Sequence, residues 1–173
     1  MHRTIAMKLM IIALFGCAFA APALAQEPAG CDKFKWPIEQ EQRLLSGAAI
    51  TKLASGSAVA AAFPVAVEVT LMPLAEAKLP RAPERAPRLS SSFAGFIAVA
   101  APFGHGVVKI SLSSEAWIDV LQNGVLVKSQ GFTGATACTG IRKSVRFDLK
   151  TEPFVVQLSN VAGNAIRIAI TAD

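Results

Sequence analysis

The chain has 173 residues, 17 of them basic and 12 acidic, which gives a formal net charge of +5 at pH 7. Two of the basic residues and none of the acidic ones lie in the first 25 positions, so the 148 residues that follow carry a formal charge of +3. This length suits one domain with its own hydrophobic core, and a modest charge without basic and aromatic residues clustered on one element argues against nucleic-acid binding.

The first 25 residues have the pattern of a secretory signal peptide. Arg3 and Lys8 precede an apolar run, Leu9 to Ala20, and the small-residue cleavage motif Ala23-Leu24-Ala25 follows it. We therefore expect residues 1–25 to be removed and the mature chain, 26–173, to be periplasmic or secreted.

Cys17 offers a minor alternative, the processing site of a lipoprotein, because a small residue precedes this cysteine. The bulky Phe15, two positions before it, argues against lipidation. The apolar run is also shorter than the roughly 20 residues that span a bilayer. We expect no transmembrane segment in the mature chain.

The mature chain has two cysteines, Cys31 and Cys138. An even pair in an oxidising compartment predicts a disulfide. This bridge would join the start of the mature chain to a late loop, and its role would be structural, because the chain has no closely spaced redox pair such as C-x-x-C.

The N-terminal segment, 26–47, is expected to be helical. Pro37 suits the first position of a helix, and Gly47 is a typical stop. Apolar positions are few between them, so we expect this helix to pack as a lid at one end of a larger unit.

Residues 48–62 are rich in alanine, serine and glycine and show little periodicity, whereas Val65–Leu71 alternates as a strand does. The segment 78–92 holds three prolines and three arginines, and this proline density excludes a helix or a central strand. We expect an extended loop there, either a solvated connection or a basic strip that contacts anionic components of the envelope.

From Phe93 onwards, short β-favouring runs recur with turn residues between them. The expected strands are Phe93–Ala101, Val107–Leu112, Ala116–Leu121, Val125–Ser129, Ser144–Leu149, Phe154–Ser159 and Ile166–Thr171. Asn123-Gly124 between two of these runs predicts a hairpin, while the glycine-rich stretch 131–140 is expected to form a loop.

Seven or eight short strands, each with one apolar face, predict a mainly β protein. We expect one domain over 26–173, an antiparallel β-sandwich of jelly-roll-like type with a short N-terminal helix.

The sequence points to no catalytic residue and no metal site. The mature chain has one histidine, His105, which lies between two glycines, and it has no tyrosine. Glu115 and Asp119 would lie roughly 13 Å apart along a strand, too far for a glycosidase pair, and Arg146 is a candidate cross-strand partner for Asp119. We expect no cofactor.

A binding surface is the alternative to a catalytic site, because functional side chains are often presented on loops by a rigid scaffold. An exposed Trp117 would offer a platform for a sugar ring, although the N-terminal helix or Trp36 would more commonly cover it. The candidate surface comprises Trp36, Arg81, Arg85, Arg88, Trp117 and Phe132.

The segments Cys31–Pro37, Pro83–Pro87, Ser114–Val120 and Arg142–Phe147 resemble a group of small exported bacterial proteins to which the name homogentisate 1,2-dioxygenase is often attached. The resemblance covers nearly all of the mature chain, and the name implies an iron oxygenase. Homogentisate dioxygenases hold their iron with two histidines and a glutamate, whereas the mature chain has a single histidine. No iron ligand can therefore be assigned from this resemblance.

These observations together favour an exported, periplasmic, non-catalytic accessory or binding protein of the cell envelope, with an envelope protein or a glycan as its partner. The alternative is an enzyme, either a homogentisate 1,2-dioxygenase-type oxygenase or a hydrolase that uses His105.

Overall fold

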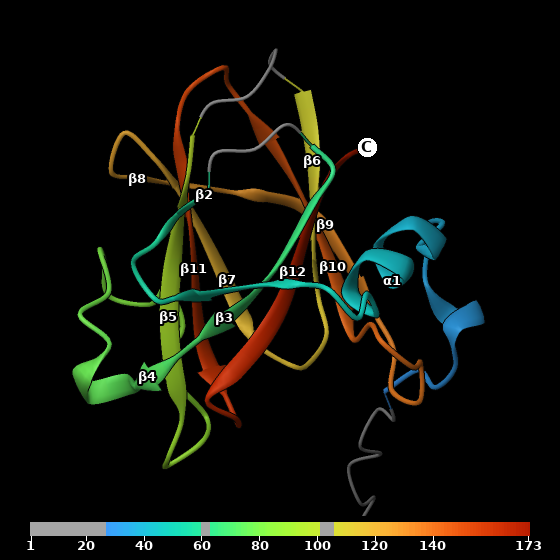
Figure 1. Ribbon diagram of the computed structural model, residues 1–173, viewed down its shortest axis with the longest axis horizontal. Coiled ribbons are helices and arrows are strands. Elements are labelled where there is room, and N and C mark those ends of the chain that lie inside the picture. Colours follow the sequence, from blue (N-terminus) through green and yellow to red (C-terminus); the bar gives the residue numbers. More distant parts are fainter. Residues whose placement is uncertain (1–26, 60–62, 101–105) are drawn as a thin grey trace, which may run out of the picture.

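The computed structural model describes residues 27–59, 63–100 and 106–173 (Figure 1). These residues form two packed β-sheets and one short α-helix. The prediction of a mainly β protein is confirmed, and a sandwich is consistent with this arrangement. The expected signal peptide, 1–25, Cys17 and His105 lie outside the described residues, so the expectations about them stay predictions.

The two sheets are named here after their central strands. The β12 sheet has the order β1 (Thr51–Ala54), β3 (Val65–Thr70), β12 (Ala165–Ala172), β6 (Gly106–Leu112), β10 (Lys143–Leu149) and β9 (Ser129–Gly134). The β11 sheet has the order β2 (Ala58–Val59), β5 (Phe93–Val99), β11 (Phe154–Val161), β7 (Trp117–Gln122) and β8 (Val125–Val127), and β4 (Met72–Pro73) also pairs with β5.

The sheets are mixed rather than wholly antiparallel, which corrects the prediction at two places. β1 runs parallel to β3, and β2 runs parallel to β5. Both short strands come from the weakly patterned stretch 48–62, where no strand was expected. This one segment pairs first with β3 and then with β5, so it supplies partners to the edge of each sheet in turn.

The hairpin expected at Asn123-Gly124 is confirmed. It joins β7 to β8 with Gln122 opposite Val125, and both turn residues have positive φ angles, 51° and 75°. Two consecutive residues of this conformation are typical of a type I′ turn, which asparagine and glycine adopt at little cost. The expected loop 131–140, in contrast, begins inside β9, which pairs with β10.

The core lies between the two sheets and is built by the alternation seen in the sequence. Every second side chain of a strand points inward, and apolar residues of both sheets meet in a single cluster. Its members with no exposed surface are Val69, Ile97, Ile110, Leu112, Val120, Val156 and Leu158.

The N-terminal segment lies against the outer face of the β12 sheet, on the right in Figure 1. It contains a short 3₁₀-helix, η1 (Cys31–Lys33), and the helix α1 (Glu39–Leu45). Ile38 is the N-cap and is buried in a second apolar cluster with Leu45 and Ala169, so Pro37 precedes the helix instead of starting it. The helix therefore covers a sheet face, not one end of the sandwich.

Candidate binding surface

The proline- and arginine-rich segment 78–92, called the strap below, crosses the outer face of the β11 sheet. It has no helix or strand, as its prolines predict, and it leads from the short 3₁₀-helix η2 (Leu74–Glu76) to β5 (Figure 1). Its backbone amides donate to side chains of the sheet: Arg81 to Gln157 Oε1 (3.2 Å), Glu84 to Asp119 Oδ2 (3.2 Å) and Arg88 to Asn160 Oδ1 (2.7 Å). The strap is thus held in place along its length and is not a freely solvated connection.

Asp119 and Gln157 form the middle anchor of the strap. They are cross-strand neighbours on β7 and β11, their side chains are hydrogen-bonded at 3.2 Å, and they are 3% and 0% exposed. The expected partner of Asp119, Arg146, lies on the other sheet and pairs with Asp173 instead. The sequence signal for this anchor was an acidic residue within an otherwise apolar strand, but its partners lie 35 and 38 residues away along the chain.

The strap carries four basic side chains. Lys78, Arg81, Arg85 and Arg88 are exposed, and none of them forms an ion pair within the described ranges. The strap holds these four basic residues and one acidic residue, Glu84, so its formal charge of +3 equals that of residues 26–173 as a whole. The other residues of this range have equal numbers of basic and acidic side chains, so the excess positive charge is concentrated in the strap.

The charged side chains on the outer face of the β12 sheet, in contrast, form ion pairs with one another. There the basic side chains are paired with carboxylates: Lys109 with Glu41 (2.9 Å), Arg146 with Asp173 (2.7 Å) and Arg167 with Glu68 (2.9 Å). Charge on that face is neutralised within the protein, whereas charge on the strap is available to a partner.

Trp117 lies under the strap and is half-buried. The guanidinium of Arg85 stands 4.0 Å from the centre of its ring, and Lys143 Nζ stands 5.7 Å away. Its Nε1 donates to Asp119 Oδ1 at 2.7 Å. The ring is covered, as expected for a large aromatic side chain, but Arg85 covers it instead of the N-terminal helix or Trp36.

Trp36 and Phe132 belong to the other side of the molecule. Trp36 packs in the cluster under the N-terminal segment, donates from Nε1 to Ser144 Oγ (3.2 Å) and lies 4.2 Å from the guanidinium of Arg146. Phe132 is on the edge strand β9, 61% exposed, with Lys35 Nζ at 5.7 Å from its ring centre. The structure therefore brings four of the six candidate residues together, Arg81, Arg85, Arg88 and Trp117, and separates these two from them.

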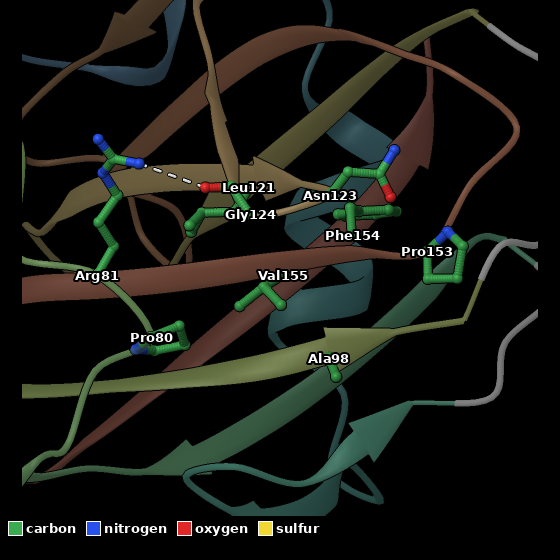
Figure 2. A pocket seen from close by; sticks show the side chains of 9 residues that line it. All are labelled: Pro80, Arg81, Ala98, Leu121, Asn123, Gly124, Pro153, Phe154 and Val155. Carbon is green, nitrogen blue, oxygen red and sulfur yellow. Dashed lines mark hydrogen bonds between the residues drawn. The ribbon is translucent and has the colours of Figure 1, made fainter.

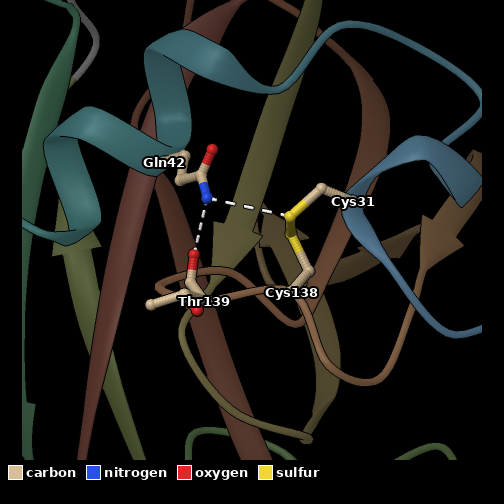
Figure 3. Close-up of a disulfide and its surroundings, with 4 residues drawn as sticks. All are labelled: Cys31, Gln42, Cys138 and Thr139. Atoms are coloured by element: carbon tan, nitrogen blue, oxygen red, sulfur yellow. Dashed lines mark hydrogen bonds between the residues drawn. A yellow bond between two sulfur atoms is a disulfide. The ribbon is translucent and has the colours of Figure 1, made fainter.

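The Cys31–Cys138 disulfide is present, with the two Cα atoms 4.8 Å apart (Figure 3). It joins η1 to the loop after β9. Gln42 of α1 reinforces this junction, because its Nε2 donates to the carbonyl of Thr139 at 2.7 Å. The bridge ties the N-terminal segment to the β12 sheet, as a structural disulfide would.

A buried carboxylate, Glu41, holds α1 to the same sheet. It is 1% exposed, accepts a hydrogen bond from Thr171 Oγ1 at 2.6 Å and pairs with Lys109. Burial raises the pKa of Glu41, but the hydrogen bonds from Thr171 and Lys109 lower it more, so the pKa lies below its ordinary value.

Within the ranges described, no group of three or more histidine, cysteine, aspartate or glutamate side chains is placed to hold a metal ion. No described helix is long and apolar enough to cross a membrane. No family model matches the chain, and no curated protein and no solved structure matches it either.

Proposed function

We propose that this chain is an exported, non-catalytic binding protein of the cell envelope, and that the strap is its binding surface for an anionic partner. The observation that carries the proposal is the set of four exposed basic side chains that form no ion pair with a described residue, on a backbone fixed by hydrogen bonds. The pattern of a signal peptide in residues 1–25 and the Cys31–Cys138 disulfide support an oxidising, extracytoplasmic location.

The strap suits an anionic partner because of its chemistry and its rigidity. Arginine recognises carboxylates and phosphates through a planar fork of donors, and Arg81, Arg85 and Arg88 recur every three or four residues along an extended segment. Because the backbone is already anchored, little ordering would be needed on binding. Among the partners expected, an acidic glycan fits best, since it presents regularly repeated anions along an extended chain.

Immobilised polygalacturonate, an acidic polysaccharide, is a suitable probe, with neutral dextran as the reference. Replacing Arg81, Arg85 and Arg88 together with glutamine should weaken binding by at least about tenfold, because three exposed ion pairs at ~0.5 kcal/mol each supply that factor. Binding should also fall as salt is added.

The matched control replaces Arg43, Lys128 and Lys150 with glutamine, three exposed basic residues outside the strap. This variant has the same net charge as the triple variant of the strap, but it should bind polygalacturonate nearly as well as the wild type does. Equal weakening in both triple variants would show general charge attraction without a site, and no binding at low salt would contradict the glycan as partner.

A further inference from the structure

A small pocket opens on the outer face of the β11 sheet, next to the first residues of the strap (Figure 2). Its volume is about 250 Å³. Pro80 and Arg81 border it on one side, and the β7–β8 turn at Asn123 and Gly124 borders it on the other.

The floor of the pocket is apolar. Ala98, Val155 and Leu121 are cross-strand neighbours on β5, β11 and β7, and they form one row across the sheet. They point outward because their neighbours in sequence point into the core. On this sheet face the strap covers the next row, which contains Gln157 and Asp119, and leaves the apolar row as the pocket floor, where Ala98 and Val155 are partly exposed and Leu121 is buried.

One cation stands at the rim. The backbone amide of Arg81 is anchored on Gln157, and its Nη1 donates to the carbonyl of Gly124 at 3.3 Å. Its Nε and Nη2 have no hydrogen-bond partner among the described residues. The Glu152 carboxylate is bound by Asn123 Nδ2 at 2.7 Å and is not part of the lining, so the lining has one formal charge, which is positive.

We propose that this pocket binds an aliphatic carboxylate, with the carboxylate on the Arg81 guanidinium and the hydrocarbon chain on Val155 and Ala98. An apolar floor with one convergent charged group is typical of small-molecule sites, and the volume lies just below their usual range of roughly 300–1,000 Å³. This volume suits a ligand with a short hydrocarbon chain. This site shares Arg81 with the proposed glycan surface but needs none of the other basic residues of the strap, so the two proposals can be tested separately.

Titration of the full mature protein with octanoate tests the proposal, by calorimetry and by backbone amide shifts. Octanoate should bind at least about tenfold more tightly than acetate, because burying two methylene groups supplies that factor. The uncharged analogue 1-octanol should bind several-fold more weakly than octanoate. The amide shifts should change at Ala98, Leu121 and Val155.

Two variants locate the site. Arg81→Gln keeps the backbone hydrogen bond to Gln157 and should weaken octanoate binding about fivefold or more, while Val155→Trp should fill the pocket and abolish binding. Arg88→Gln, in the same strap but outside the pocket, is the control and should leave octanoate affinity unchanged.

The proposal is overturned if octanoate and acetate bind alike, if Arg81→Gln and Arg88→Gln weaken binding equally, or if amide shifts change away from the pocket floor. These outcomes are distinct from failure of the glycan surface. A double variant, Arg85→Gln with Arg88→Gln, should lose affinity for polygalacturonate and keep its affinity for octanoate.

Discussion

At the scale of single residues, Asp119 joins three parts of the chain. Its carboxylate accepts hydrogen bonds from Trp117 on the same strand, from Gln157 on β11 and from the backbone of Glu84 in the strap. Because Asp119 is only 3% exposed, water cannot easily replace these bonds. This carboxylate fixes a loop against a sheet.

Replacing Asp119 with alanine should lower the free energy of unfolding by about 1–3 kcal/mol, because it leaves buried donors without an acceptor. Urea denaturation would measure the change. Asp148→Ala, at an exposed position of β10, is the control and should stay within ~0.5 kcal/mol of the wild type. Similar stabilities of the two variants would mean that Asp119 does not anchor the strap.

At the scale of elements, α1 is too short to be stable by itself, since isolated helices of fewer than about 12 residues are marginal in water. Contacts with the β12 sheet hold it at both ends. Glu41 pairs with Lys109 and Thr171 in its first turn, and Arg167 Nη1 donates to the carbonyl of Leu45 at 2.8 Å at its C-terminus. A cation at that end also complements the helix dipole.

The anchoring of α1 should depend on pH. Because the pKa of Glu41 in the folded protein lies below its ordinary value of 4.5, the ionised carboxylate stabilises the fold above that pH. This stabilisation is lost as the pH falls through the folded-state pKa. Glu41→Gln should therefore show a shallower loss of unfolding free energy between pH 5 and 3, measured by urea denaturation at each pH.

Glu39→Gln, at an exposed position of the same helix, is the matched control and should keep the wild-type slope. The hydrogen bond from Arg167 lowers the pKa of Glu68 as well. Protonation of Glu68 therefore adds the same acid sensitivity to the wild type and to both variants. Parallel pH profiles for Glu41→Gln and the wild type would rule out Glu41 as a source of the acid sensitivity.

At the scale of the whole molecule, a segment without strands covers part of the outer face of each sheet. The strap lies on the β11 sheet, and the N-terminal segment lies on the β12 sheet (Figure 1). The first is held by hydrogen bonds, and the second is held also by the Cys31–Cys138 disulfide, which links residues 107 positions apart.

Reduction of this disulfide should lower the melting temperature by on the order of 10 °C. The chain-entropy model assigns a loop of this length about 4–5 kcal/mol of stabilisation, and each kcal/mol shifts the melting temperature by about 2–4 °C in a protein of this size. Thermal melts with and without reductant measure the shift. Cys31→Ser should melt at the lower temperature under both conditions, and an unchanged wild-type melt on reduction would contradict this role.

The strand pattern was largely readable from the sequence, because alternation depends only on which face of a strand meets the core. It predicted β3, β10, β11 and β12 to within a few residues, and Asn123-Gly124 predicted the hairpin since few other residues adopt its backbone angles. It missed β1, β2, β4 and β9. The strands β1, β2 and β9 lie at sheet edges and are rich in small or polar residues, so they have weak apolar periodicity, and β4 is only two residues long.

Composition and periodicity were enough to predict a β-rich chain with one cysteine pair after residue 25, an arginine-rich segment without regular structure and a signal-like N-terminus. The positions of the candidate residues relative to one another depend on how the sheets pack, which periodicity does not specify. Alternation assigns a side chain to a face but not to a sheet, so it could not show that Trp117 belongs to the β11 sheet while Trp36 packs against the β12 sheet. Nor could it show that Asp119 anchors the strap, because that contact joins residues 35 positions apart by a hydrogen bond that leaves no periodic trace in the sequence.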